Sequence, residues 1–74
     1  MITYYKLFDI LNRKGIKKLE LMEQAKISRG TLAKLSKNEP VSITTINSIC
    51  NVLQCQPGDI LEHIPDPVQL SLDL

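Results

Sequence analysis

Residues 18–37 constrain the fold of this chain more than any other stretch, because they contain two short amphipathic segments separated by a few residues. With Lys18 counted as the first position, apolar residues stand at positions 4, 8, 10, 15 and 18, which are Leu21, Ala25, Ile27, Leu32 and Leu35. Apolar residues three or four apart lie on one face of an α-helix. The spacing predicts two helices, over 18–25 and over 29–37, that pack together at a turn, with the outer face of the second helix exposed. Ser28 is the predicted N-cap of the second helix.

The remainder of residues 1–64 is also predicted to be helical. Its start and stop signals predict a helix over about 3–14, with Thr3 as N-cap and Gly15 as stop; a helix over 43–54 after Ser42; and a short helix from Pro57. No stretch of residues 1–64 alternates convincingly like a strand. We therefore predict an all-α, compact five-helix domain.

The charges are divided between the two halves of the chain, although the net charge is +1. Residues 1–38 contain nine Lys and Arg against three acids, a balance of +6, whereas residues 39–74 contain five acids and no Lys or Arg. Such a basic segment attracts phosphate groups; the alternative is chance clustering on a solvated surface. The N-terminal half is the candidate surface for a nucleic acid.

Residues 65–74 form a tail that differs from the predicted domain of residues 1–64. After a Pro-Asp-Pro stretch, apolar and polar residues alternate strictly from Val68 to Leu74, which is typical of a strand. One interpretation is a disordered terminus. The other, which the four apolar residues on one face favour, is a dimerisation arm that pairs with another subunit.

Several classes of protein are excluded by composition. Cys50, Cys55 and the lone His63 are too few for a zinc site, and the two thiols are expected to pack as apolar groups in a reducing compartment. No apolar stretch approaches the roughly 18 residues of a membrane span, and the N-terminus lacks the features of a signal peptide. We expect a cytoplasmic protein without a metal or cofactor.

The second helix of the predicted pair is small and basic on the face opposite Leu32 and Leu35. At 100° per residue, that face contains Gly30, Ala33, Lys34 and Lys37, with Arg29 and Thr31 on its flanks. A glycine here costs about 1 kcal/mol relative to alanine. It is tolerated either because helix starts permit glycine or because the backbone closely approaches another surface, such as a base edge in the DNA major groove.

Two lysines, Lys17 and Lys18, stand where the first helix of the pair begins. Helix starts favour Ser, Thr or Asp and disfavour cations. A phosphate bound at this end would make the lysines favourable, because the helix N–H groups and the ammonium groups both attract it. The alternative is that the two lysines are simply solvated and bind nothing. Ser42, Thr44 and Thr45 offer a second, weaker candidate phosphate site, since hydroxyls at a helix start commonly serve as caps.

No single motif between residues 16 and 61 identifies a family, but the order and spacing of these motifs are specific when they are taken together. The residues concerned are Leu21, Ala25, Lys26, Ile27, Ser28, Thr31, Leu32, Leu35, Val41, Ser42, Ile46, Ile49, Cys50, Leu53 and the run 55–61. In this order and spacing the chain resembles the Xre family, the lambda-repressor/Cro-like helix-turn-helix regulators of bacteria, their phages and mobile elements. The run containing Cys55 is similar to a compact subgroup in which both cysteines recur as structural positions.

The resemblance implies a five-helix domain whose third helix reads the major groove, usually as a homodimer on a palindromic operator. By position it implies base contacts from Ser28, Arg29, Gly30, Ala33 and Lys34. It implies phosphate contacts from Lys17, Lys18, Lys37, Asn38 and Thr44. Because the groove face has no Gln or Asn to read adenine, Arg29 and Lys34 are the expected readers of guanine.

The chain departs from the usual pattern of these proteins at four positions. They often have Ser or Thr at the position of Lys17, Gln at that of Lys18, Ala at that of Met22 and Gly at that of Lys26. Met22 implies a slightly wider helix pair. If the turn requires a positive φ at Lys26, a residue with a side chain stores strain on the order of 1 kcal/mol there.

These observations predict a sequence-specific DNA-binding transcriptional regulator, expected to be a repressor, with double-stranded DNA and a second subunit as partners. The alternative is a helix-turn-helix scaffold for protein–protein contact, such as an antitoxin-like or regulatory partner that binds through the tail. An enzyme is not expected, because the sequence shows no evident acid/base pair, no nucleophile beside His63 and no Gly-rich phosphate loop.

Overall fold

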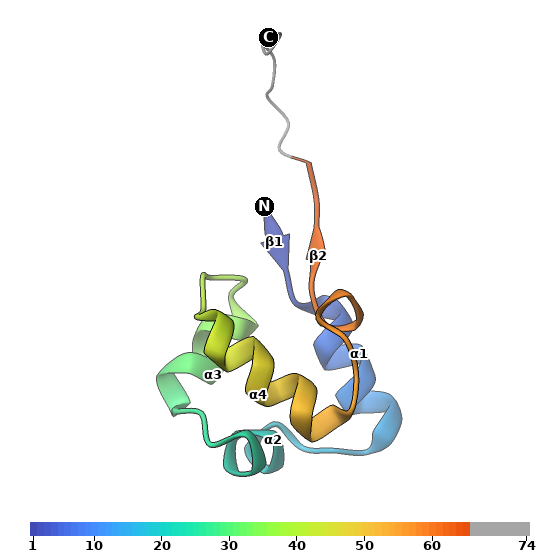
Figure 1. The fold of residues 1–74 in the computed structure, drawn as a ribbon, viewed down its shortest axis with the longest axis vertical. Coiled ribbons are helices and arrows are strands. Elements are labelled where there is room, and N and C mark those ends of the chain that lie inside the picture. The colour runs from blue at the N-terminus through green and yellow to red at the C-terminus, as the bar shows by residue number, and fades with distance from the viewer. Residues whose placement is uncertain (66–74) are drawn as a thin grey trace, which may run out of the picture.

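The fold combines four α-helices with a small two-stranded sheet, as Figure 1 shows. The computed structural model describes residues 1–65. In chain order the elements are β1 (Ile2–Thr3), α1 (Tyr5–Lys14), α2 (Lys18–Ala25), α3 (Arg29–Ser36), α4 (Ile43–Leu53), a 3-10 turn (Pro57–Asp59) and β2 (Glu62–His63). The mostly helical architecture is confirmed, and the predicted spans of α2, α3 and α4 agree with the structure to within one residue. The predicted arm lies outside the described residues, apart from its first residue, Pro65.

The sheet corrects the expectation that residues 1–64 contain no strand. Its strands are antiparallel, with the pairs Ile2–His63 and Thr3–Glu62. Met1 continues the ladder, because its ammonium donates a 2.6 Å hydrogen bond to the carbonyl of Ile64 and its carbonyl accepts a 2.8 Å bond from the Ile64 N–H. Strands of two residues are too short to show alternation, and no local pattern reports a pairing between residues this far apart in sequence.

The first helix begins later than predicted. Thr3 does not cap it: Thr3 lies in β1 and is 1% exposed, and the N-cap of α1 is Tyr4. The predicted stop is confirmed, because Gly15 adopts φ +68° and its N–H donates to carbonyls of the last turn. A left-handed residue at this position is a common way to end a helix, and glycine adopts it without steric cost.

A 3-10 turn replaces the predicted fifth helix. It begins at Pro57 as expected, and the carboxylate of Asp59 accepts a 2.9 Å hydrogen bond from the backbone N–H of Gln56. Because residues 57–59 make a single turn before the chain extends into β2, they form no α-helix. The turn delivers Ile60 into the core, where it is fully buried.

One hydrophobic core joins all four helices. Its buried residues are Tyr4, Leu7, Leu11, Leu21, Ala25, Leu35, Ile46, Ile49, Leu53 and Ile60. Burial of each large aliphatic side chain contributes about 1.5–3 kcal/mol. The five apolar positions of residues 18–37 behave as their spacing predicts, because Leu21, Ala25 and Leu35 are buried while Ile27 and Leu32 are half-buried. The inner faces of α2 and α3 are thus fixed, and their outer faces remain in solvent.

Residues 1–65 include no helix of the length and apolar character that crossing a membrane requires. Within the same residues, no cluster of three or more His, Cys, Asp or Glu side chains is placed to hold a metal ion. Cys50 and Cys55 are free thiols that pack, half-buried, against the core. In this position the two thiols act as part of the packing at the end of α4.

Candidate nucleic-acid interface

Three residues make the turn between α2 and α3. Lys26 ends α2 in the left-handed conformation, with φ +57°, and its N–H donates to the carbonyl of Met22. Ser28 begins α3, because its Oγ accepts a 3.0 Å hydrogen bond from the backbone N–H of Thr31. The predicted cap at Ser28 is confirmed, as is the positive φ considered for Lys26. A lysine in this conformation costs on the order of 1 kcal/mol.

The outer face of α3 is exposed along its length. Ser28, Arg29, Gly30, Ala33 and Lys34 are all exposed, whereas Leu35 on the inner face is fully buried. A Cβ added at Gly30 would meet no atom closer than the Ser28 Oγ, at 3.7 Å, which is an ordinary contact. The fold therefore does not require glycine at this position. The face is a thin, cationic ridge of the kind that the sequence predicts.

At the start of α2, an acidic side chain supplies the cap that the lysines cannot provide. The Glu20 carboxylate accepts a 2.8 Å hydrogen bond from the backbone N–H of Lys17. The sequence interpretation missed this bond, although a Glu three residues after the helix start is a known capping signal. Glu20 thereby offsets the unfavourable charge of Lys17 and Lys18 in the absence of a bound anion.

An aromatic ring of α1 positions the Lys18 side chain. The Lys18 Nζ lies 4.8 Å from the centre of the Phe8 ring. Cation–π contacts at exposed sites contribute about 0.5–1 kcal/mol. The ammonium is therefore held between the start of α2 and the side of α1, and it remains exposed to solvent.

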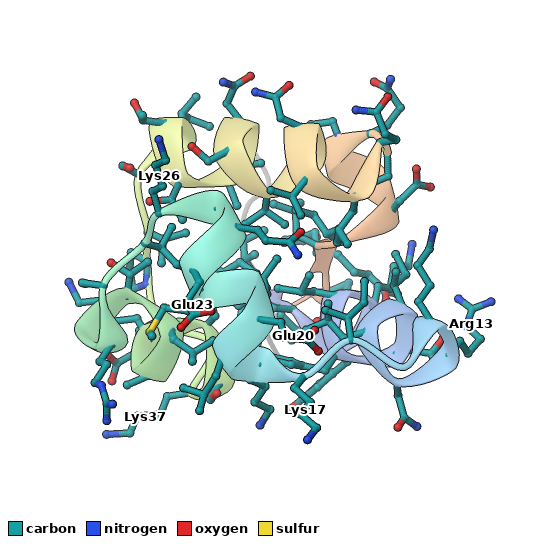
Figure 2. The ribbon with its side chains drawn as sticks, turned by 90° about the horizontal axis from the view of Figure 1, so that it is seen from below. Arg13, Lys17, Glu20, Glu23, Lys26 and Lys37 are labelled. Atoms are coloured by element: carbon teal, nitrogen blue, oxygen red, sulfur yellow. The ribbon has the colours of Figure 1, made fainter. Side chains whose placement is uncertain are left out.

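Figure 2 shows how the labelled charged side chains are distributed. Lys17, at the start of α2, and Lys37, after the end of α3, extend toward the lower edge of the view, whereas Lys26 extends in the opposite direction. Arg13 lies at the far end of α1, where it makes a 3.0 Å ion pair with Asp9. In this view Lys17 and Lys37 point to one side of the domain, and Lys26 points away from it.

Asn38, one of the predicted phosphate contacts, has a structural role in the loop after α3. Its Oδ1 accepts a 2.9 Å hydrogen bond from the backbone N–H of Tyr4, and its Nδ2 donates a 3.1 Å bond to the hydroxyl of Tyr5. Asn38 also adopts φ +58°, a conformation that asparagine tolerates better than most residues. These bonds tie the loop to the start of α1 and leave one amide hydrogen of Asn38 for another acceptor. No local sequence pattern predicts these hydrogen bonds of Asn38.

At the start of α4, the hydroxyls of Ser42 and Thr45 belong to the helix cap, whereas Thr44 is exposed. Ser42 Oγ accepts a 3.1 Å hydrogen bond from the backbone N–H of Thr45, and the two hydroxyls lie 3.1 Å apart. The starts of α2 and α4 and the outer face of α3 therefore present cations and a hydroxyl, the groups that proteins use to contact DNA phosphates.

A short helix joined by a three-residue turn to a second helix with an exposed, basic outer face defines a helix-turn-helix DNA-binding domain. Residues 6–66 match the Cro/C1-type HTH DNA-binding domain, and the chain belongs to this family. It is 36% identical over 59 residues to YozG of Bacillus subtilis (strain 168), described as an uncharacterized HTH-type transcriptional regulator, and the match spans 77% of this chain and 70% of YozG.

A solved structure agrees with this assignment. The crystal structure of the transcriptional regulator VanUg has a TM-score of 0.84 and 45% sequence identity to the chain, over 88% of this chain and 87% of VanUg. The fold is therefore lambda-repressor-like, and the family resemblance seen in the sequence is confirmed. The chain is an HTH DNA-binding transcriptional regulator, and its family is one of regulators rather than of enzymes.

Proposed function

We propose that α3 lies in the DNA major groove and that the protein is a repressor that recognises a particular operator. Arg29 and Lys34 contact guanine, for which both side chains supply suitable donors. Ser28, Gly30 and Ala33 complete the base-contacting face and, being small, let the helix backbone approach the base edges closely. The observation that carries this proposal is the exposed outer face of α3, held outward by the fully buried Leu35.

Phosphate contacts flank the reading helix. Lys17 and Lys18 bind one phosphate together with the start of α2. Lys37 and Thr44 bind the backbone on the other side of α3, and Asn38 adds its remaining amide hydrogen. Contacts of this kind fix the register of the protein on the duplex without reading sequence.

The protein acts as a cytoplasmic homodimer on a palindromic operator, and it uses no cofactor or small-molecule ligand. Two copies related by a two-fold axis place their reading helices about 34 Å apart, one turn of the double helix. Residues 1–64 form the DNA-binding domain, with residues 18–37 as the helix-turn-helix. Residues 65–74 form the dimerisation arm, which the alternation after Pro67 supports.

Selection from a random-duplex library tests the proposal. The wild-type protein should enrich one palindromic sequence. Arg29→Ala should relax the preference at one position of each half-site by about 1–3 kcal/mol, and Lys18→Ala should weaken binding to all sequences alike. Lys26→Ala is the matched control, because Lys26 is a helix-turn-helix lysine turned away from Lys17 and Lys37, and its removal should leave affinity unchanged.

The result that would overturn the proposal is equally specific. If no sequence is enriched and neither Arg29→Ala nor Lys18→Ala changes affinity, the outer face of α3 does not read DNA. Circular dichroism and thermal unfolding of each variant would show that any loss of binding occurs in a folded protein. Both side chains are exposed, so neither substitution removes core packing.

A further inference from the structure

An apolar groove lies between β1 and the start of α4, and Asn38 and Pro40 of the loop after α3 also line it. Its aliphatic lining includes Ile2 of β1, Val41 and Ile43 before and at the start of α4, and Leu61 after the 3-10 turn. Ile43 is 80% exposed and Ile2 is 40% exposed. Ile43 does not belong to the hydrophobic core. Aliphatic side chains gathered on a surface in this way are typical of an interaction site.

The free edge of β1 borders this groove. Met1 and Ile64 exchange both of their backbone hydrogen bonds. Because hydrogen-bonded and non-hydrogen-bonded pairs alternate along an antiparallel ladder, Ile2 and His63 form a non-hydrogen-bonded pair. The N–H and C=O of Ile2 therefore point outward from β1. Such an edge is a template for another strand.

The chain contains a segment suited to this edge. From Val68 to Leu74 apolar residues alternate with polar ones, so a strand formed here would have one aliphatic face and one polar face. A strand added to β1 would form backbone hydrogen bonds with Ile2 and could direct its aliphatic face into the groove. This mode of recognition combines affinity from the backbone with specificity from alternate side chains.

The geometry of the sheet favours a segment from a second copy over the same copy. β2 runs antiparallel to β1, so a chain leaving β2 would have to reverse and run parallel to β1 to pair with its free edge. Parallel pairing is slightly less stable per residue than antiparallel pairing. Only Pro65, Asp66 and Pro67 separate Ile64 from Val68. A segment from another copy can instead approach antiparallel.

We propose that residues 68–74 of a second copy add a strand to the free edge of β1 and cover Ile43 with their aliphatic side chains, and that reciprocal exchange of these segments builds the dimer. This inference rests on the homodimer of the proposed function and identifies the surface that forms it. Each copy contributes one groove and one segment, so the dimer contains two equivalent contacts.

Sedimentation of the full chain without DNA tests each half of the contact. Ile43→Asp removes the groove side and Leu72→Asp removes the segment side, and each should sediment at the monomer mass, half that of the wild type. Leu19→Asp is the matched control, because Leu19 is a 54% exposed aliphatic residue in the first turn of α2, as Ile43 is in the first turn of α4. Asp is favourable at both helix starts, so both variants should fold.

A mixture of the two monomeric variants separates segment exchange from a simpler contact. The Ile43→Asp copy retains an intact segment and the Leu72→Asp copy retains an intact groove, so the mixture should form a heterodimer held by one restored contact. A dimer in which two grooves face each other directly would show no such recovery, and that result would overturn the inference while leaving the homodimer in place.

Two further outcomes would also overturn it. If Leu19→Asp disrupts the dimer as strongly as Ile43→Asp, the effect does not belong to the groove. If the wild type sediments as a monomer, both the segment exchange and the homodimer of the proposed function fail. Base reading by Arg29 is measured separately in the duplex selection, so the two sets of results remain distinguishable.

Discussion

The phenol of Tyr4 donates a 2.9 Å hydrogen bond to the backbone carbonyl of Glu39, which joins the residue before α1 to the loop after α3. The backbone N–H of Tyr4 donates to Asn38 in the same loop. Tyr4 is 3% exposed and belongs to the hydrophobic core. One buried residue therefore fixes the path by which the chain leaves the end of α3 and enters α4.

Tyr4→Phe should destabilise the protein by about 0.5–1.5 kcal/mol at pH 7, because the Glu39 carbonyl loses its partner while the ring packing remains. Burial raises the pKa of Tyr4, and the backbone of Val41 partly opposes this. The stability that this raised pKa contributes is present below about pH 10, the ordinary value, and is lost as pH rises through the folded pKa. Urea unfolding should therefore show the difference between wild type and variant shrinking above about pH 10.

Tyr5→Phe is the control for that experiment. Tyr5 is 62% exposed and accepts its hydrogen bond from Asn38 on the surface, so its loss should cost less than about 0.5 kcal/mol. Equal stability of wild type and Tyr4→Phe at all pH values would show that the Tyr4–Glu39 bond does not hold the loop.

Lys26→Gly should stabilise the fold by about 1 kcal/mol. The residue has φ +57°, a conformation that costs a side-chain-bearing residue energy and costs glycine none. Lys26→Ala removes the same ammonium but keeps a Cβ, so it should give little or none of this gain. Thermal unfolding of the two variants measures the difference, and equal melting temperatures would contradict a strained turn.

Gly30→Ala should separate stability from DNA binding. The added methyl group meets only an ordinary contact within the domain, and alanine favours a helix by up to about 1 kcal/mol. We therefore expect a melting temperature at or above that of the wild type, together with weaker operator binding caused by the methyl group at the base edges. Unchanged operator affinity would show that the α3 backbone does not approach the bases closely at this residue.

Glu20→Gln should raise DNA affinity about two- to five-fold. Gln can still accept the hydrogen bond from the Lys17 N–H, but the negative charge beside the proposed phosphate is gone. Glu23→Gln makes the same change of net charge one turn further along α2 and should have a smaller effect. Equal gains for both variants in a binding titration would indicate net charge alone.

DNA binding should weaken steeply with salt. About four to eight phosphate contacts predict a slope of roughly −4 to −7 for the logarithm of the binding constant against the logarithm of salt concentration. Lys18→Ala should make this slope shallower by about 1. A slope near zero would mean that the basic residues of the N-terminal half do not bind phosphates.

Sequence patterns predicted the features of this fold that depend on residues close together in the chain, namely the helices and their caps. The spacing of Leu21, Ala25 and Leu35 predicted the helix pair, and Ser28 and Ser42 were recognised as caps because their partners lie three residues away. The cap from Glu20 could have been found by the same rule.

What the sequence did not predict depends on contacts between distant residues. The pairing of Ile2 with His63 and the bond from Tyr4 to Glu39 form only when the whole domain is assembled. After the 3-10 turn at Pro57–Asp59 the chain extends into β2 and does not continue as a helix. A segment of one turn has too little periodicity to distinguish a 3-10 turn from the start of an α-helix. The same limit applies to Asn38, whose partners lie in α1 and the residue before it.

The hydrogen bonds between Met1 and Ile64 have a consequence for the order in which the domain opens. They close a loop of about sixty residues, at an entropic cost of roughly 3–4 kcal/mol, whereas the helices are held by near neighbours and a shared core. We expect the Ile64 amide to exchange with deuterium through local opening of the ladder, long before the amides of Leu21 and Ile49 exchange by global unfolding. The pairing of Met1 with Ile64 would then open and close while the DNA-binding helices remain folded.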